Sequence, residues 1–369
     1  MKYYIIAGEA SGDLHGANLM RALLRQDADA HFRFWGGDAM QDVGGPSVRH
    51  IRDLAIMGFV EVVRHLRTVL GNIRFCKQDI IQYSPDVLVT IDYPGFNLKM
   101  AKFAHQHGIK TVHYISPQLW AWKKGRIKSM RLNLDRLCYI LPFEQEFYAH
   151  NNFPQAVYVG HPLLDAVASF KRQDSDTLSF DKPVIALLPG SRQQEIKRML
   201  PLMLEVADNH PEYQFVVASM TLIGETLYSD IIGDRSNVTI IQDHTYQLLS
   251  HAHAAIVCSG TATLETALFN VPQVVGYRAN AVSVAIARRL IGTKIKYISL
   301  VNLIADSPVV TELIQGDCNI TQLEQIFARI TVDSESREKM LNEYAQLHIL
   351  LGNAGASDRT AEVIIQLLH

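Results

Sequence analysis

The stretch Ala186-Leu-Leu-Pro-Gly-Ser-Arg-Gln-Gln-Glu-Ile196 lies just past the middle of the chain and decides its fold class. Residues 183–188 are almost wholly apolar, which is typical of a short strand buried on both faces of a parallel sheet. The turn Pro189-Gly-Ser191 ends this run, and residues 193–210 return to helix-forming types. The sequence therefore predicts a strand, a glycine turn and a helix in that order.

This turn predicts a binding site for an anion. The free N–H groups at the start of a helix and the positive end of its dipole meet there. Beside Gly190 and Ser191, Arg192 adds a permanent charge on a planar fork that suits phosphate oxygens. The alternative is an ordinary strand-to-helix turn whose arginine pairs with a surface carboxylate, and this stretch alone does not decide between the two.

A second stretch of the same kind follows later in the chain. The apolar residues 254–258 lead into Ser259-Gly-Thr-Ala-Thr-Leu-Glu265, whose small residues allow a ligand to approach backbone amides at a helix start. The carboxylate of Glu265 could bind a vicinal diol such as a ribose, and the alternative is a capping box with Thr261 or Thr263. Two such stretches at the carboxyl ends of strands in one sheet are far more specific than either alone.

Short apolar runs alternate with helical sequence throughout the chain, which predicts an α/β protein with doubly wound parallel sheets. In the first half these runs are residues 3–7, 86–91, 111–115, 136–141 and 156–159. In the second half they are residues 183–188, 214–219, 238–241, 254–258 and 273–277. Beyond Asn302 we expect helix, through Leu313, Phe327, Leu341 and Leu350.

A chain of 369 residues that is 48% hydrophobic can bury two substantial cores. We predict one Rossmann-like domain over residues 1–170 and a second over 171–351, with the polar segment 171–182 as the linker. The end segment 352–369 is expected to pack back on a domain, and the first domain is the candidate.

Polar side chains follow the strands of the first half, at the edge where open parallel sheets bind ligands. Glu9 and Ser11 lie in Gly8-Glu-Ala-Ser-Gly-Asp13, whose glycine spacing is not that of a dinucleotide-binding loop. Asp92 directly follows the strand at 86–91, where a partly desolvated carboxylate could act as general base toward a hydroxyl. The alternative for each is a role in capping the helix that follows.

Two stretches of the first half are apolar with basic neighbours. Leu54-Ala-Ile-Met-Gly-Phe-Val60 precedes several basic residues, and Trp120-Ala-Trp-Lys-Lys-Gly-Arg126 places two tryptophans beside three cations. Such stretches can lie on an anionic membrane or line an apolar ligand site. Core-facing helices and packing tryptophans are the commoner alternatives.

Composition excludes several classes of protein. A net charge of −2 argues against a dedicated nucleic-acid binder. The four cysteines are far apart, which fits a reduced, cytoplasmic setting with all four as packing residues. We expect neither a signal sequence nor a membrane-spanning segment. Metal chemistry is poorly supported, because the sequence has no helical zinc pair, no Walker loop and no nucleophile elbow.

Sequence blocks that carry these features occur in order from residue 8 to about 315. Those of the first half are Gly8-Glu-Ala-Ser-Gly-Asp13, Met57-Gly-Phe-Val-Glu61, Asp92-Tyr-Pro-Gly-Phe-Asn97, Tyr114-Ile-Ser-Pro117 with Trp120-Ala-Trp122, Leu141-Pro-Phe-Glu144 and Gly160-His-Pro162. Those of the second half are Leu187-Leu-Pro-Gly-Ser-Arg192, Ser259-Gly-Thr-Ala-Thr-Leu-Glu265, Val275-Gly-Tyr-Arg278 and Asn302-Leu-Ile-Ala305. Together the blocks resemble the signature sequences of the lipid-A-disaccharide synthases, over nearly the whole chain.

The resemblance implies a GT-B glycosyltransferase, with two Rossmann-like domains whose parallel sheets face an interdomain cleft. The family joins UDP-2,3-diacylglucosamine to 2,3-diacylglucosamine 1-phosphate (lipid X), in lipid A and lipopolysaccharide biosynthesis. It releases UDP and forms a β-1,6-linked disaccharide 1-phosphate, with inversion of the anomeric centre. The resemblance implies no cofactor and no metal, no nucleic acid, and peripheral association with the cytoplasmic face of the inner membrane. The oligomeric state stays open, with a homodimer as one alternative.

Site residues carry over by their match to the family's blocks. Asp92 is the expected general base for the acceptor 6-hydroxyl, and Arg192 is expected to stabilise the departing diphosphate. The expected donor-binding residues are Gly190, Ser191, Arg192, Ser259, Gly260, Thr261, Glu265, Arg278 and Asn302. The expected acceptor residues are Glu9, Ser11, Gly12, Asn97 and Ser116. The expected membrane or acyl-chain contacts are Leu54, Ile56, Met57, Phe59, Trp120, Trp122, Lys123, Lys124 and Arg126.

Two departures and two rival functions accompany this resemblance. Gly95 stands where many relatives have a second acid, which makes Asp92 the clearer choice of base, and His15 is given no catalytic role. A UDP-sugar 2-epimerase is the rival with the same fold. A non-catalytic nucleotide-binding or membrane-scaffold protein is the rival of a different class.

Overall fold

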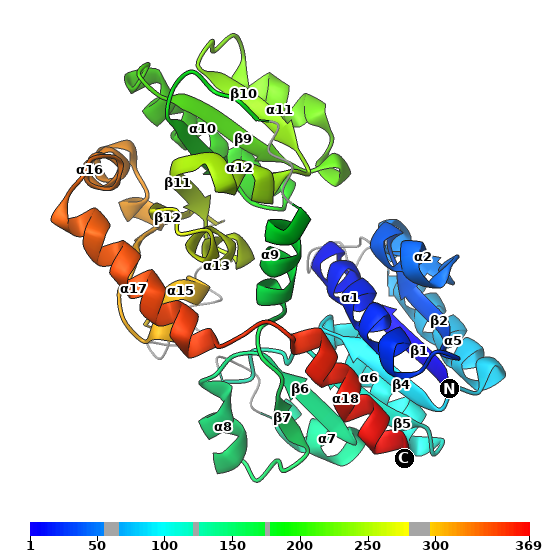
Figure 1. Ribbon diagram of the computed structural model, residues 1–369. Helices are drawn as coiled ribbons and strands as arrows, with labels where there is room; N and C mark the ends of the chain where they lie inside the picture. Colours follow the sequence, from blue (N-terminus) through cyan, green and yellow to red (C-terminus); the bar gives the residue numbers. More distant parts are fainter. Residues whose placement is uncertain (55–65, 121–124, 174–177, 280–295) are drawn as a thin grey trace. The chain divides into compact units, whose positions relative to one another are not determined.

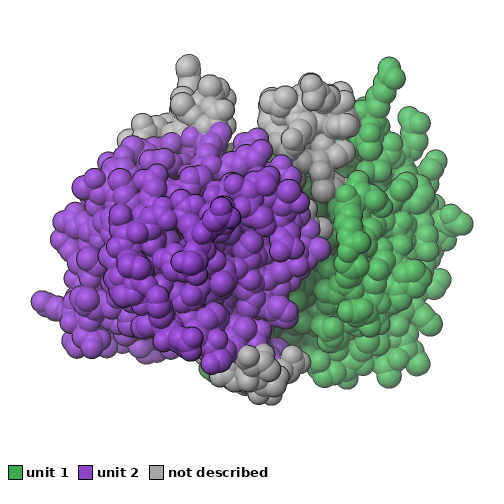
Figure 2. Space-filling view, turned by 90° about the horizontal axis from the view of Figure 1, so that it is seen from above, with its two compact units in different colours: residues 1–165, 353–369 green, residues 166–352 purple. Residues whose placement is uncertain are grey.

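The computed structural model describes residues 1–54, 66–120, 125–173, 178–279 and 296–369. The chain divides into two compact units, which are coloured separately in Figure 2. Unit 1 consists of Met1–Asp165 together with Asn353–His369, and unit 2 consists of Ala166–Gly352. Each unit is built around one parallel sheet with helices packed against it (Figure 1).

Among the described residues, the sheet of unit 1 has seven strands in the order β3-β2-β1-β4-β5-β6-β7. The strands are β1 (Lys2–Ala7), β2 (His31–Gly36), β3 (Arg49–His50), β4 (Val87–Ile91), β5 (Lys110–Tyr114), β6 (Arg136–Tyr139) and β7 (Ala156–Tyr158). The helices are α1 (Ala10–Gln26), α2 (Asp38–Gly44), α3 (Ile51–Leu54), α5 (Leu66–Tyr83), α6 (Pro94–Gln106), α7 (Arg126–Asn133), α8 (Glu144–His150) and α18 (Ala356–Leu368). All neighbouring strands of this sheet run parallel.

The sheet of unit 2 has six strands within the described ranges, in the order β10-β9-β8-β11-β12-β13. The strands are β8 (Val184–Leu188), β9 (Gln214–Ser219), β10 (Val238–Gln242), β11 (Ala252–Cys258), β12 (Gln273–Tyr277) and β13 (Thr311–Ile314). The helices are α9 (Pro162–Gln173), which starts in unit 1, α10 (Gln193–Asn209), α11 (Glu225–Ile232), α12 (Thr245–His251), α13 (Thr261–Leu268), α15 (Leu300–Ala305), α16 (Ile320–Thr331) and α17 (Glu335–Leu351). Two short 3-10 turns, Thr221–Ile223 and Gln315–Asp317, complete the described elements.

The central strands are apolar because helices cover both of their faces. Every residue of β4 and of β8 is buried. Tyr4, Trp35 and Met100 belong to one core of unit 1, and Ala186 and Val257 belong to a core of unit 2. Burial of such apolar surface supplies most of the driving force for folding.

The last helix of the chain, α18, packs against α1 and β5 of unit 1. The Asp165 carboxylate accepts hydrogen bonds from the backbone N–H groups of Gly355, Ala356 (3.2 Å) and Ser357 (2.9 Å), and so caps this helix. The guanidinium of Arg359 donates to the carbonyls of Val159 (2.7 Å), Ala354 (3.2 Å) and Asn353 (3.2 Å). The chain leaves unit 1 after Asp165 and returns to it at Asn353, so these hydrogen bonds join the two crossing points within unit 1.

Four elements differ from the prediction. Leu313, expected in a helix, lies in the edge strand β13. Strands β2 and β3 were not predicted. Helix α9 continues to Gln173, so the chain enters unit 2 within a helix and part of the expected linker is helical.

Candidate active site

The carboxyl ends of β1 and β4, which are neighbours in the sheet of unit 1, carry the two acids Glu9 and Asp92. Asp92 directly follows β4 in a left-handed backbone conformation (φ 42°), which aspartate tolerates better than most residues. Its backbone N–H donates to the Tyr114 carbonyl at 2.9 Å. Glu9 is the N-cap residue of α1, but in the described residues its carboxylate makes no capping hydrogen bond.

The pKa of Asp92 is raised to about 6. Burial is the largest cause, the charge of Glu9 adds to it, and a hydrogen bond from the Tyr93 backbone opposes both. A carboxylate with such a pKa is close to the best compromise between availability and basicity for a general base near neutral pH.

Asn97 holds the end of β4 in place. Its side-chain amide donates to the carbonyls of Ile6 (3.3 Å), Ile91 (3.0 Å) and Asp92 (2.8 Å). Its Oδ1 atom is buried and has no hydrogen-bond partner in the described part of the chain. Asn97, predicted as an acceptor contact, thus has a visible role in positioning the residue expected to be the base.

The Ser116 hydroxyl forms hydrogen bonds with other groups of unit 1. Its hydroxyl donates to the Pro117 carbonyl at 3.0 Å and shares a short hydrogen bond with the Tyr148 hydroxyl. Beside it, the fully buried Glu144 accepts from the Leu141 backbone N–H at 3.2 Å. Burial raises the pKa of Glu144 to about 8, against hydrogen bonds from two backbone N–H groups and from Ser116. Sequence reasoning missed this acid, although its place just after an apolar strand was the signal that singled out Asp92.

Of the other two predicted acceptor residues, Gly12 is buried and Ser11 is exposed. Gly12 is buried on α1, and a Cβ atom there would lie 3.4 Å from the Cβ atom of Ala7 in β1. This is an ordinary van der Waals distance, so the packing of α1 on β1 does not by itself require glycine at this position.

In unit 2, the predicted anion-binding turn surrounds a carboxylate of the chain itself. Gly190 has a φ of 114°, and a Cβ atom there would lie 2.7 Å from Glu195, so this position requires glycine. The Ser191 backbone N–H donates to Glu195 Oε2 at 3.1 Å, and Arg192 Nη1 donates to Glu195 Oε1 at 3.4 Å. The structure therefore contains the alternative that the sequence left open, an arginine paired with a carboxylate. That carboxylate, of Glu195, is itself an anionic group bound by the N–H of Ser191 and the guanidinium of Arg192.

The second predicted turn lies on the neighbouring strand β11. Ser259 is held by its backbone N–H, which donates to the Gly276 carbonyl at 3.0 Å, and by its hydroxyl, which donates to the Ile298 carbonyl at 3.2 Å. Gly260 and Thr261 are exposed at the start of α13, and a Cβ atom at Gly260 would meet nothing within 4 Å. The side-chain position of Gly260 is thus open.

Glu265 lies in α13, where its carboxylate accepts a hydrogen bond from the Tyr246 hydroxyl at 3.0 Å. Burial raises the pKa of Glu265, and the hydrogen bond from Tyr246 opposes that rise. The expected alternative, a capping box, does not occur among the described residues: the N-cap residue Gly260 makes no side-chain cap, and Thr263 Oγ1 donates to its carbonyl at 2.8 Å.

The remaining two predicted donor-binding residues, Arg278 and Asn302, differ in burial. Arg278 directly follows β12 and is half-buried. Asn302 is buried, and its amide donates to the Val310 carbonyl and to Glu312, both at 2.9 Å, while its Oδ1 accepts from the Val310 N–H at 2.9 Å. These bonds give Asn302 a structural role in joining α15 to the segment that leads into β13.

Comparison with known proteins decides the family. A family model described as lipid-A-disaccharide synthetase matches residues 3–366. This chain belongs to the lipid-A-disaccharide synthetase family.

Relatives within the lipid-A-disaccharide synthetase family match along their whole length. The lipid-A-disaccharide synthase of Geobacter sulfurreducens is 35% identical over 373 residues, which cover 99% of this chain and 96% of that protein. The enzyme of the same name from Syntrophus aciditrophicus is 38% identical over 374 residues, which cover 99% and 97%. The resemblance of the sequence blocks is thereby confirmed.

Solved structures confirm the fold class of this family member. The UDP-GlcNAc 2-epimerase of Neisseria meningitidis superposes with a TM-score of 0.70 at 14% identity, covering 99% of this chain and 100% of that one. A glycotransferase of kitacinnamycin also gives a TM-score of 0.70 at 14% identity, covering 100% and 99%. At this identity the likeness shows two Rossmann-like sheets of the GT-B type and nothing of activity. The family match therefore weighs against the rival 2-epimerase.

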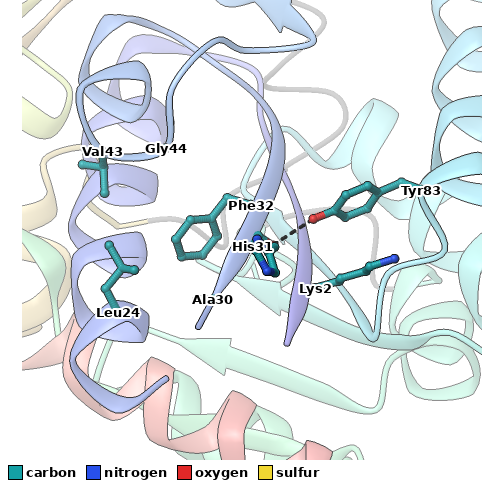
Figure 3. Close-up of a pocket in the computed structure, with 8 residues that line it drawn as sticks. All are labelled: Lys2, Leu24, Ala30, His31, Phe32, Val43, Gly44 and Tyr83. Atoms are coloured by element: carbon teal, nitrogen blue, oxygen red, sulfur yellow. Dashed lines mark hydrogen bonds between the residues drawn. The ribbon is translucent and has the colours of Figure 1, made fainter. Parts of the chain in front are cut away.

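A surface cavity of about 560 Å³ lies elsewhere in this synthetase-family chain. It is lined by Lys2, Leu24, Ala30, His31, Phe32, Val43, Gly44 and Tyr83 (Figure 3). Lys2 and His31 begin β1 and β2, so the cavity lies at the amino ends of these strands. Glu9 and Asp92 lie at the opposite, carboxyl edge, so we do not assign the cavity to the reaction.

The predicted membrane contacts fall largely on segments that the structure does not describe. Outside the described residues lie Ile56, Met57, Phe59, Trp122, Lys123 and Lys124. Leu54 ends α3, and its side chain is likewise outside the description. The Trp120 ring packs edge-on against Phe143, with centroids 5.1 Å apart, and the half-buried Arg126 begins α7.

Neither a membrane-spanning helix nor a metal-binding cluster occurs in the described ranges. No helix there combines the length and apolar character needed to cross a membrane. No group of three His, Cys, Asp or Glu side chains in those ranges is arranged to hold a metal ion. The four cysteines, Cys76, Cys138, Cys258 and Cys318, are buried free thiols.

Proposed function

We propose that this family member condenses UDP-2,3-diacylglucosamine with 2,3-diacylglucosamine 1-phosphate, giving the β-1,6-linked disaccharide 1-phosphate and UDP. Its relatives at 35% and 38% identity are named lipid-A-disaccharide synthases. The observation that carries the proposal is the half-buried carboxylate of Asp92 at the end of β4, with a pKa raised to about 6. A transferase that activates an acceptor hydroxyl needs such a group.

In the proposed reaction, the ionised Asp92 takes the proton of the acceptor 6-hydroxyl as that oxygen attacks the anomeric carbon of the donor. The bond between this carbon and the diphosphate oxygen breaks, and its electron pair leaves with UDP. Attack from the side opposite the leaving group inverts the anomeric centre. Asp92 ends the step protonated, and the charge balance is completed by the UDP anion.

The departing diphosphate gains negative charge, which fixed donors of unit 2 can stabilise. Arg192 and the N–H groups of the Gly190–Ser191 turn are the proposed donors, with the Ser259–Thr261 turn on the adjacent strand. Support comes from the contacts of Ser191 and Arg192 with the Glu195 carboxylate, since these donors already bind an anionic group. Glu265 would bind the ribose, and Arg278 would lie near the nucleotide.

Unit 1 would bind the acceptor, and its apolar, basic-flanked stretches 54–77 and 117–131 would contact acyl chains and the cytoplasmic face of the inner membrane. Both substrates carry acyl chains and the acceptor carries a phosphate, which these stretches suit. The test is binding to anionic vesicles by the wild type and by a Leu54→Ser, Ile56→Ser, Phe59→Ser variant. Equal binding would refute the assignment.

The function is tested by incubating the protein with both substrates and separating the products. We expect disaccharide and UDP, whereas an epimerase would return only an altered UDP-sugar. Asp92→Ala should lower kcat by about 10²- to 10⁴-fold while UDP binding is retained. Unchanged turnover in this variant would exclude Asp92 as the base, and absence of disaccharide with the wild type would exclude the function itself.

A further inference from the structure

We propose that Tyr246 is a positioning residue that holds the Glu265 carboxylate for binding the ribose of a uridine nucleotide. This inference rests on the proposed function, in which Glu265 binds the donor's ribose. Tyr246 lies in none of the sequence blocks that resemble the family, and only the fold brings it to Glu265.

Packing fixes the position of the Tyr246 hydroxyl. The residue lies on α12, and its ring packs against Phe269 with centroids 5.3 Å apart and edge-on against Phe170 with centroids 5.9 Å apart. Phe170 comes from α9 and Phe269 directly follows α13. Because three different elements hold the ring, its hydroxyl has little freedom beyond rotation of the O–H bond.

The hydroxyl is placed to select one orientation of the carboxylate. It donates to Glu265 Oε1 at 3.0 Å, a normal length for a hydrogen bond to a carboxylate. A carboxylate held at one oxygen presents its second oxygen, Oε2, in a fixed direction. Two neighbouring ribose hydroxyls need such a fixed acceptor, since a rotating carboxylate would lose side-chain entropy on binding.

The hydrogen bond also favours the charged form of the acid. Glu265 is buried enough for its pKa to rise, and Tyr246 acts against that rise. A charged acceptor binds a hydroxyl more strongly than a neutral acid does. The same contact thus supplies both the direction and the charge that recognition of a ribose requires.

This role predicts a change in nucleotide preference as well as a loss of affinity. A site that hydrogen-bonds a sugar hydroxyl rejects the analogue that lacks it, because a buried polar group is then left unpaired. The wild type should therefore bind UDP more tightly than 2′-deoxy-UDP. Loss of the Tyr246 hydroxyl should reduce this preference, since the carboxylate is no longer held toward the 2′-hydroxyl.

The experiment measures Kd for UDP and for 2′-deoxy-UDP by calorimetry with the full-length wild type and with Tyr246→Phe. Phenylalanine keeps the ring and its packing, and thermal unfolding checks that the variant is folded. We expect the wild type to prefer UDP by about tenfold or more, and Tyr246→Phe to lose most of this preference because its affinity for UDP falls more than its affinity for the deoxy nucleotide. An equal loss of affinity for both nucleotides, or an unchanged preference, would overturn the proposal.

A double-mutant cycle adds a second criterion. If Tyr246 acts through Glu265, Tyr246→Phe should cost nothing further in UDP affinity once Glu265→Gln is present. Additive losses would show that the tyrosine acts independently and would also overturn the proposal. The proposed function is judged separately, by formation of disaccharide with the wild type, so that its failure leaves a distinct result.

Discussion

The surroundings of Asp92, the proposed base, set the pKa of its carboxylate. Because its pKa is raised to about 6, the carboxylate is protonated and inactive as a base below that pH and ionised above it. We therefore expect kcat/KM to rise with pH through about 6, which initial rates from pH 4.5 to 8 would measure.

Glu9→Gln should move this acidic limb to lower pH, since the charge of Glu9 contributes to the raised pKa. Burial, the larger cause, would remain in the variant. If the acidic limb of the pH profile lay at the same pH in the wild type and in Glu9→Gln, Glu9 would not contribute to the raised pKa of Asp92.

Glu195 competes with the proposed diphosphate for the same donors. Its carboxylate accepts from Ser191 and Arg192, and its side chain is 17% exposed. Removing this negative charge should let an anionic ligand bind more tightly. We expect Glu195→Gln to bind UDP about three- to tenfold more tightly, roughly 0.6–1.4 kcal/mol, as calorimetry would measure.

The matched control for this change is Glu205→Gln, an exposed position on the same helix. It should leave the UDP affinity unchanged. Weaker binding by Glu195→Gln would instead mean that this acid orients Arg192 for the ligand.

The sequence allowed us to predict which residues lie at strand ends. It did not allow us to predict the hydrogen-bond partners of residues in buried networks. Asp92 and Gly190 follow apolar runs, so their position at a sheet edge needs only the strand pattern. Asn302 and Ser116 have partners that no local pattern reveals, since Asn302 bonds Glu312 ten residues away and Ser116 bonds Tyr148, 32 residues away. The sequence singled out these two residues as ligand contacts, which stays a prediction, but it did not reveal their partners within the fold.

Among the elements, α10 and α16 are joined by a histidine that responds to pH. His210 hydrogen-bonds Glu212 through Nδ1 at 2.9 Å and Glu324 of α16 through Nε2 at 2.7 Å. Burial lowers the pKa of His210, but the two acids outweigh it and the net pKa is raised. The stabilisation is therefore fully present below the ordinary histidine pKa and is lost as pH rises through the raised value.

We expect His210→Gln to lower stability by about 0.5–1 kcal/mol at pH 5.5, since these acids are partly exposed, and by less at pH 8.5. Denaturant unfolding at the two pH values measures this. The exposed His244→Gln on the same unit is the control and should show no such difference. A pH-independent effect of His210→Gln would mean that its packing on Phe327 matters more than its charge.

Central strands such as β4 and β8 were predicted well because burial on both faces makes them almost wholly apolar. Strand β2 escaped prediction because Arg33 interrupts its apolar pattern. That arginine forms an ion pair with the buried Asp79 of α5, with Nε donating to Oδ2 at 2.8 Å, so a charged residue is satisfied inside the fold. Strand β13 lies at the edge of its sheet and contains Glu312, which receives hydrogen bonds from Ser299 and Asn302.

At the scale of the whole molecule, unit 2 is a continuous insertion in unit 1. We expect the fragment 162–352, which starts at the first residue of α9, to unfold cooperatively and to bind UDP. The fragment 1–165 lacks α18, whose buried face includes Ala356, Ala361 and Ile364. It should expose apolar surface and bind a hydrophobic dye.

The control joins residues 1–165 to 353–369 through a short glycine-serine linker, which the contact between Asp165 and Gly355 makes feasible. This chain should unfold cooperatively and bind little dye. A well-folded 1–165 fragment would show that α18 is dispensable for unit 1.

The return of α18 to the first sheet also has a consequence for synthesis on the ribosome. Residues up to Asp165 emerge early, yet the helix that covers α1 and β5 is translated only after all of unit 2. Unit 2 is thus the first unit to have all of its residues available, and the sheet of unit 1 is covered by α18 only after unit 2 has been synthesised. If translation stops before α18 is made, that sheet stays uncovered at β5. This is the strand in which the Tyr114 carbonyl accepts a hydrogen bond from the backbone N–H of Asp92.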